Sequence, residues 1–146
     1  MLYERGVIEA IERIQIMATK LVKKCKKLSH ELRLKFLELP TLLYRRIRGD
    51  MIQVFKMVCM NEGLNESFPI FHRPSCSYTR GHKFKLVKSS FKLNLRKYYF
   101  TNRVVDLWND LPEHFVLCEN VLLFEKRLDE CWSNVSWKYN YETFIY

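Results

Sequence analysis

The sequence lacks the short motifs that mark most enzyme and metal sites. It has no glycine-rich nucleotide loop, no G-x-S-x-G and no H-E-x-x-H, which excludes the enzyme classes that these motifs define. The five cysteines are widely spaced, without a C-x-x-C or C-x-x-H pair, so we predict no structural zinc site. The four histidines fall in different predicted elements. We therefore expect no catalytic residue, no metal, no cofactor and no small-molecule substrate for this chain.

Glycine and proline are also scarce, with four of each in 146 residues, whereas 48% of the residues are hydrophobic and 14% are aromatic. This composition is typical of a folded domain rather than a disordered tail. No apolar run approaches the roughly 20 residues of a membrane span, and charged residues interrupt the start at Glu4 and Arg5. We expect an intracellular protein, nuclear or cytoplasmic, without a membrane partner, in which the cysteines are reduced core residues.

The formal net charge is +9, and the positive charge is unevenly distributed along the chain. Residues 1–60 contain 13 Lys and Arg against 6 Asp and Glu, residues 61–103 contain 9 against 2, and residues 104–146 contain 3 against 8. The first two parts are each net +7 and the last is net −5. A basic surface attracts nucleic acid or anionic lipid, and a phosphate backbone is the commoner partner. We therefore expect RNA or DNA backbone as the main partner.

The apolar pattern predicts a mainly α fold with a small β-hairpin, which places the chain in the α+β class. Helical period favours helices over residues 7–27, 29–37, 42–60, 100–111 and 121–132. The buried stripe of the first helix is predicted to contain Ile8, Ile11, Ile14, Ala18, Leu21, Val22 and Cys25.

Period-two alternation over residues 83–86 and 91–95 predicts the two strands of the hairpin. Residues 61–82 form a long connection before it. Thr41 is predicted to cap the third helix. The aromatic tail, residues 133–146, either docks on the core or frays.

The stretch around the fourth predicted helix has the clearest pattern. One face is apolar, with Phe100, Val104, Leu107, Trp108 and Leu111, and Pro112 ends the helix because a proline disfavours helical backbone in the residue before it. We interpret this stretch as an anchor element, whose apolar side packs on the core and whose basic residues lie beside that face. An ordinary amphipathic helix with solvated charges is the alternative.

Ten basic residues are candidate phosphate contacts: Lys20, Lys23, Lys24, Arg45, Arg46, Arg48, Arg80, Lys83, Arg96 and Arg103. Lysine and arginine suit this chemistry because they donate charge-assisted hydrogen bonds to phosphate oxygens. Asp50 is predicted either to pair with Arg46, four residues before it, or to orient the arginines of its own helix. The alternative is that these charged side chains only keep the surface soluble, or form ion pairs with acidic residues in the last third of the same chain.

Several pieces of the sequence, in this order and spacing, resemble the segment that follows the reverse-transcriptase core in Jockey-like non-LTR retrotransposons. They span about Ile8 to Trp132 and include Ile11-Glu12-Arg13-Ile14-Gln15, Tyr44-Arg45-Arg46 with Gly49-Asp50, Thr79-Arg80-Gly81-His82, Asn102-Arg103-Val104-Val105 with Trp108-Asn109, and Phe124-Glu125-Lys126-Arg127-Leu128-Asp129. Ile16-Met17 departs from the resemblance, because it stands where such elements carry a basic pair.

The resemblance implies that residues 1–60 form thumb-like helices, and that residues 83–132, the hairpin and two helices, pack with them as one domain. The fingers and palm, with the metal-binding aspartates, would lie upstream. It also implies a non-catalytic fragment of an RNA-directed DNA polymerase that grips the template–primer backbone and has the missing polymerase core as a further partner. The alternatives are a protein-interaction or structural domain, and a decayed element fragment without selected function.

Overall fold

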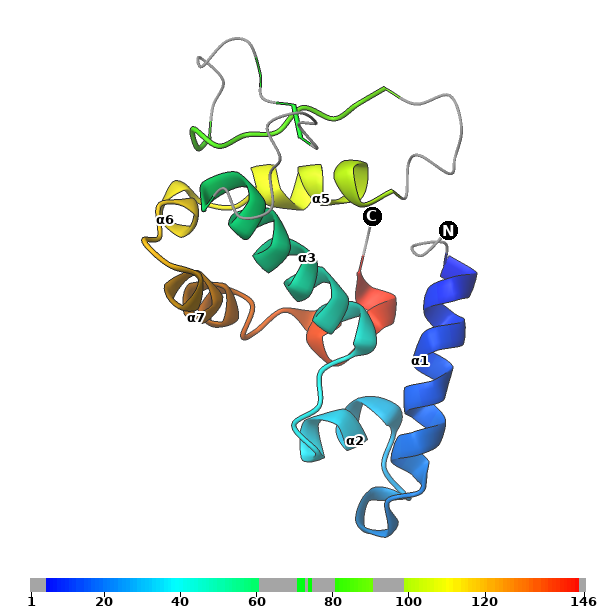
Figure 1. Ribbon diagram of the computed structural model, residues 1–146. Coiled ribbons are helices and arrows are strands. Elements are labelled where there is room, and N and C mark those ends of the chain that lie inside the picture. Colours follow the sequence, from blue (N-terminus) through cyan, green and yellow to red (C-terminus); the bar gives the residue numbers. More distant parts are fainter. Residues whose placement is uncertain (1–4, 61–70, 73, 75–80, 91–98, 145–146) are drawn as a thin grey trace. The chain divides into compact units, whose positions relative to one another are not determined.

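Figure 1 shows a computed structural model of the chain, in which residues 5–60, 71–72, 74, 81–90 and 99–144 are described. The elements are α1 (Arg5–Lys20), η1 (Lys23–Cys25), α2 (His30–Phe36), α3 (Leu42–Cys59), α5 (Phe100–Asn109), α6 (Glu113–Val116), α7 (Val121–Cys131), η2 (Ser136–Lys138) and η3 (Tyr141–Thr143). The mainly α class is therefore confirmed. No helix in this part of the chain is long and apolar enough to cross a lipid bilayer.

The chain forms two compact units. Unit 1 contains Met1–Arg48 and Cys131–Tyr146, and unit 2 contains Gly49–Glu130. The division falls inside α3, because each half of this helix contributes apolar side chains to a different core. It does not follow the predicted segments 1–60, 61–82, 83–132 and 133–146, and the packing of these segments as one domain stays a prediction.

The face of α1 that packs on the rest of unit 1 is partly polar. Its buried residues are Ile8, Glu12 and Thr19. Four residues that the apolar pattern placed in the core are exposed, so this part of the prediction was wrong: Ile14, Ala18, Leu21 and Val22. The apolar period does not reveal such a face, because a carboxylate or hydroxyl is tolerated in a core wherever another segment supplies a hydrogen-bond partner.

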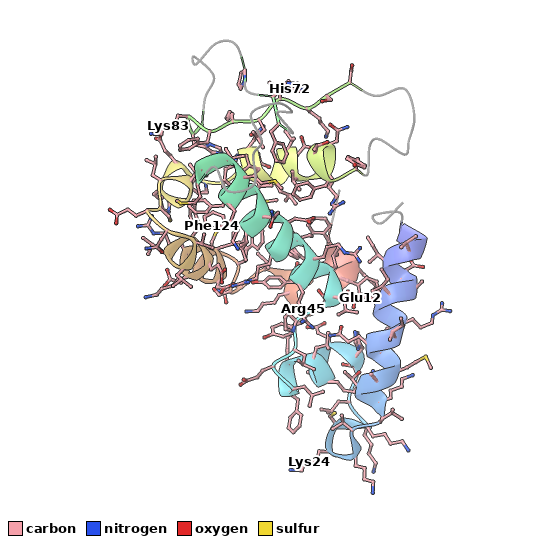
Figure 2. The ribbon with its side chains drawn as sticks, viewed as in Figure 1. Glu12, Lys24, Arg45, His72, Lys83 and Phe124 are labelled. Atoms are coloured by element: carbon pink, nitrogen blue, oxygen red, sulfur yellow. The ribbon has the colours of Figure 1, made fainter. Side chains whose placement is uncertain are left out.

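Glu12 caps α3 from a different helix. Its Oε1 accepts a hydrogen bond from the backbone N–H of Leu43 at 2.7 Å, and Figure 2 shows Glu12 on the side of α1 that faces the start of α3. Negative charge at a helix N-terminus is favourable. Thr41 Oγ1 accepts the N–H of Tyr44 at 3.1 Å, which confirms the predicted cap. The N–H groups of Leu43 and Tyr44, both in the first turn of α3, thus have side-chain partners.

Burial raises the pKa of Glu12 above its ordinary value, against the lowering effects of the Leu43 and Leu42 N–H groups and of the Arg46 charge. The folded chain therefore binds a proton at Glu12 more tightly than the unfolded chain does. The stability that this group contributes is present at low pH and is lost as the pH rises through the folded pKa. Glutamine removes the titration, so we expect Glu12→Gln to gain in free energy of unfolding relative to wild type as the pH rises from about 4 to 7.

Urea unfolding at each pH measures this difference. Glu38→Gln, at an exposed position of the same unit, controls for the loss of one carboxylate. A Glu12→Gln difference that is independent of pH would contradict the assignment.

The aromatic C-terminal segment docks on the first turns of α3. The ring of Tyr44 lies 5.2 Å from that of Trp137 and 6.2 Å from that of Trp132, between centroids. Trp137 also lies 5.1 Å from Phe144, and its carbonyl accepts a hydrogen bond from Thr41 Oγ1 at 3.0 Å. Of the two outcomes that the sequence left open, docking is the one found for residues 133–144.

Unit 2 has an aromatic core. Phe55 of α3 stacks on Phe124 of α7 with ring centroids 4.3 Å apart and planes 10° apart, and Figure 2 shows Phe124 between these two helices. Trp108 of α5 lies 6.2 Å from Phe124. Of the apolar face predicted for this stretch, Val104, Trp108 and Leu111 are confirmed as buried, and Phe100 and Leu107 are half-buried.

The predicted β-hairpin is not seen. Lys83 and Phe84 form a turn, and the β-type pairing within the described residues is one antiparallel bridge between His72 and Val87. The second predicted strand, 91–95, lies outside the described residues. Polar and apolar residues alternate over 83–86 as they would in a strand. The backbone groups of Phe84 and Leu86, however, form hydrogen bonds with side chains of α5 rather than with a second strand.

Candidate nucleic-acid interface

Five exposed lysines surround the turn that follows α1, and we call them the lysine tip: Lys20, Lys23, Lys24, Lys26 and Lys27. The helix predicted to reach residue 27 ends at residue 20, and a turn containing η1 follows. Figure 2 shows Lys24 on this turn. The lysines are therefore arranged around a turn rather than along the helix that was predicted over residues 7–27.

Cys25 stabilises this turn from its buried side. It is fully buried, and its Sγ lies 3.8 Å from the carbonyl oxygen of Thr19 and 3.6 Å from that of Val22, as a weak thiol donor. Its N–H donates to the carbonyl of Val22 at 3.2 Å, and its own carbonyl accepts from the N–H of Leu28 at 3.0 Å. These contacts give the turn a defined fold, so the lysines around it are held close together.

Arg33 of α2 braces the same turn. This residue is buried, its Nε donates to Thr19 Oγ1 at 3.2 Å, and its Nη1 donates to the carbonyl of Leu28 at 2.6 Å. Within the described residues its guanidinium has neutral partners and no carboxylate. Arg33 therefore adds an uncompensated positive charge beneath the lysine tip, and its contacts at both ends of the turn fix the backbone that carries the lysines.

The lysine tip has no acidic neighbours in sequence, because no Asp or Glu occurs from residue 20 to residue 30. The next acid, Glu31, pairs with Lys35 at 2.6 Å. No lysine of the tip forms an ion pair with any residue that the structure describes. Burial, together with the charges of Arg33 and Lys20, lowers the pKa of His30, so this imidazole is neutral at neutral pH. The local positive charge thus comes from the lysines and Arg33.

The three arginines predicted as phosphate contacts on α3 belong to the same unit. Arg45 is exposed, whereas Arg46 and Arg48 are half-buried, and the charge of Arg46 acts on Glu12. Figure 2 shows Arg45 near the start of α3, well away from Lys24. Unit 1 therefore brings Lys20, Lys23 and Lys24 together and places Arg45 at a separate position.

Arg103, predicted as a phosphate contact in unit 2, has an internal partner. Its Nε donates to Oδ2 of Asp50 at 3.0 Å and its Nη2 donates to Oδ1 at 2.9 Å. The two side chains are only 17% and 13% exposed. Such a bidentate pair ties α5 to α3. Lys83 is exposed, and Arg80 and Arg96 lie outside the described residues.

Three side chains of α5 form hydrogen bonds with the backbone of the segment 82–89: those of Asn102, Trp108 and Asn109. Asn109 Oδ1 accepts from the N–H of Leu86 and its Nδ2 donates to the carbonyl of the same residue, both at 2.9 Å. Trp108 Nε1 donates to the carbonyl of Phe84 at 2.8 Å, and Asn102 Oδ1 accepts from the N–H of Ser89 at 3.2 Å. These side chains have a structural role, which the sequence alone did not reveal.

Two lysines of the tip, Lys26 and Lys27, were absent from the predicted contacts, although they belong to the same basic run. The run itself was the signal that marks them. Among the described residues, no group of three or more His, Cys, Asp or Glu side chains is placed to hold a metal ion. The expectation of no cofactor stays a prediction.

The residues that the structure describes define a mainly helical chain with a concentrated basic turn. Comparisons with protein-family models, with curated proteins and with solved structures found no match. The resemblance to the retrotransposon segment therefore stays a hypothesis carried by the residues quoted for it.

Proposed function

We propose that this chain binds RNA or DNA through the phosphate backbone, without sequence preference, and that the lysine tip is its main contact. One observation carries the proposal: five exposed lysines lie around a single folded turn, above a buried arginine, with no carboxylate partner among the described residues. Phosphate contacts of this kind position a protein on nucleic acid but do not read its sequence.

Lysine chemistry favours backbone binding over base readout. An ammonium group is a compact point charge on a flexible stem, which follows a phosphate backbone without demanding one geometry. Specific readout is more often made by bidentate arginine, asparagine or glutamine. In this chain Asn102, Asn109 and Arg103 already have internal hydrogen-bond partners. The proposed module is therefore sequence-independent.

The resemblance extends the proposal to a particular context. The chain is proposed to be the thumb and post-polymerase part of a non-LTR retrotransposon reverse transcriptase, not catalytic alone, that grips the template–primer in the nucleus or cytoplasm. In this context the polymerase core is a second partner, and Arg45 and Lys83, both exposed, are secondary phosphate contacts.

Charge-neutral lysine variants test the proposal. Lys23→Gln, Lys24→Gln and Lys27→Gln together remove three charges from the lysine tip. We expect this tip variant to bind a fluorescently labelled 20-base-pair duplex or RNA hairpin at least about tenfold more weakly than wild type, in a fluorescence-anisotropy titration near 100 mM salt.

The matched control removes the same number of charges elsewhere, through Lys35→Gln, Lys88→Gln and Lys126→Gln. Lys35 and Lys88 are paired with Glu31 and Asp106, and Lys126 is exposed on α7. We expect this control variant to bind within about threefold of wild type. An equal loss in both variants would show that only net charge matters, and unchanged binding by the tip variant would remove the proposed site.

A further inference from the structure

The outer face of α1 has an apolar seam that the protein leaves exposed. The seam consists of Val7, Ala10, Ile14 and Met17 of α1 and of Leu21, the residue directly after the helix, and their spacing alternates between three and four residues. Ile14, Met17 and Leu21 are 67%, 63% and 84% exposed. Alternating spacing of three and four is the a and d pattern of a coiled coil, in which a narrow stripe packs against one partner helix.

The seam is not needed for the core of unit 1. The opposite face of α1 is fixed there through buried Ile8, Glu12 and Thr19. Glu12 bonds the N–H of Leu43, and Gln15 Nε2 donates to the carbonyl of Pro40 at 3.1 Å. Because α1 is held by this inner face, its outer face is presented in a fixed orientation within the unit.

The charges beside the seam indicate the partner. In the heptad set by the seam, Arg13 and Lys20 occupy g positions and are exposed, whereas the e positions hold Ile11 and Ala18. Charged e and g residues select coiled-coil partners. We propose that this seam binds an acidic amphipathic helix of another protein, with Leu or Ile in its own seam and Glu or Asp facing Arg13 and Lys20. This interaction goes beyond the proposed nucleic-acid binding.

A second copy of the chain suits the seam less well. An antiparallel pair of α1 helices would bring the g positions together and place Arg13 and Lys20 against like charges, whereas a parallel pair would place them opposite the uncharged Ile11 and Ala18. The acidic helix α7 has, among its described residues, one exposed large apolar side chain, Leu122. One such residue does not provide a complementary seam.

A membrane surface also suits the seam less well. Helices that lie on a bilayer have a broad apolar face with strongly charged residues on the opposite face. Here the face of α1 opposite the seam is buried in the unit through Ile8, Glu12 and Thr19, so it is not a charged face turned to water. An acidic helix therefore fits both the alternating spacing of the seam and the charge beside it.

The experiment uses a labelled peptide of three heptads with Leu at a and d and Glu at e and g, titrated with the full chain by fluorescence anisotropy. We expect it to bind at least about tenfold more tightly than the same peptide with Lys at e and g. Because an acidic peptide is also attracted to the lysine tip, the deciding variant is Met17→Ser with Leu21→Ser, which keeps every charge. We expect this seam variant to lose at least about tenfold in affinity for the Glu peptide.

Leu122→Ser, at an exposed position on α7, is the control and should bind the Glu peptide as wild type does. The lysine-tip variant should keep most of its peptide binding while it loses nucleic acid, which separates this inference from the proposed function. Circular dichroism checks that each variant is folded.

Four results would overturn the inference: equal binding of the Glu and Lys peptides, unchanged Glu-peptide binding by the folded seam variant, seam-dependent binding to phosphatidylserine vesicles in place of the peptide, or a wild-type dimer in sedimentation that the seam variant abolishes. The third result would assign the seam to an anionic membrane, and the fourth to a second copy.

Discussion

Replacing Trp108 with alanine is expected to lower the free energy of unfolding by about 3–5 kcal/mol, the range for deleting a large buried aromatic side chain. Trp108 is fully buried. Its indole packs near Phe124 and His82, with centroids 6.2 and 5.6 Å away, and its Nε1–H bonds the carbonyl of Phe84. Alanine would leave a cavity between helices and also a carbonyl without its donor.

Urea unfolding followed by far-ultraviolet circular dichroism measures this loss. Trp108→Phe retains most of the apolar contact but not the hydrogen bond, so we expect a smaller loss of about 1–2 kcal/mol. Leu122→Ala, at an exposed position, should stay within about 0.5 kcal/mol of wild type. A loss below about 1 kcal/mol for Trp108→Ala would mean that α5 does not anchor unit 2.

Replacing Asp50 with alanine is expected to cost about 2–3 kcal/mol, below the 3–5 kcal/mol typical of a fully buried pair because these side chains retain some exposure. The substitution would leave the guanidinium of Arg103 without its bidentate acceptor in a site only 17% exposed on the arginine side. Arg103 also lies over the ring of Phe100, 5.4 Å from its centroid, so it is held on α5 and cannot easily turn to solvent.

A double-mutant cycle isolates the pair. Arg103→Ala should destabilise to a similar extent, and the Asp50→Ala, Arg103→Ala double variant should cost less than the sum of the two single changes by about 1–2 kcal/mol. Additive losses would show that the two residues do not stabilise each other, and Arg103 would then be available again as a phosphate contact.

The sequence predicted the positions of the helices better than it predicted which of their faces are buried. The period of Val104, Trp108 and Leu111 revealed the buried face of α5, because apolar residues fill that face. The same reasoning failed for α1, whose inner face contains Glu12 and Thr19. Those polar residues are buried because distant segments supply their partners, and helical periodicity contains no information about such partners.

The prediction of a β-hairpin was wrong for a related reason. Residues 83–86 have the alternation of a strand, and Leu86 is indeed buried while Val87 is exposed. Alternation reports an extended backbone with two different sides, but not what binds it. Here the side chain of Asn109 occupies both backbone groups of Leu86, which is a contact between segments far apart in sequence.

The candidate site was partly predictable. A run of five lysines without an acid marks a basic surface from composition alone. The burial of Cys25 was predicted, but as part of a helix. The shape of the site was not predictable, because it depends on the end of α1 at Lys20 and on the turn that follows. The role of Arg103 was also not predictable, because its acceptor Asp50 belongs to another helix.

The most direct test of the central claim, that the lysine tip holds nucleic-acid phosphates, is the salt dependence of binding. The observed binding constant for a 20-base-pair duplex is measured from about 50 to 200 mM salt for wild type and for the Lys23→Gln, Lys24→Gln, Lys27→Gln variant. On double-stranded DNA each neutralised phosphate contributes about −0.9 to the log–log slope, so wild type should be steeper than the variant by about 2.7. Equal slopes for the two proteins would contradict the account.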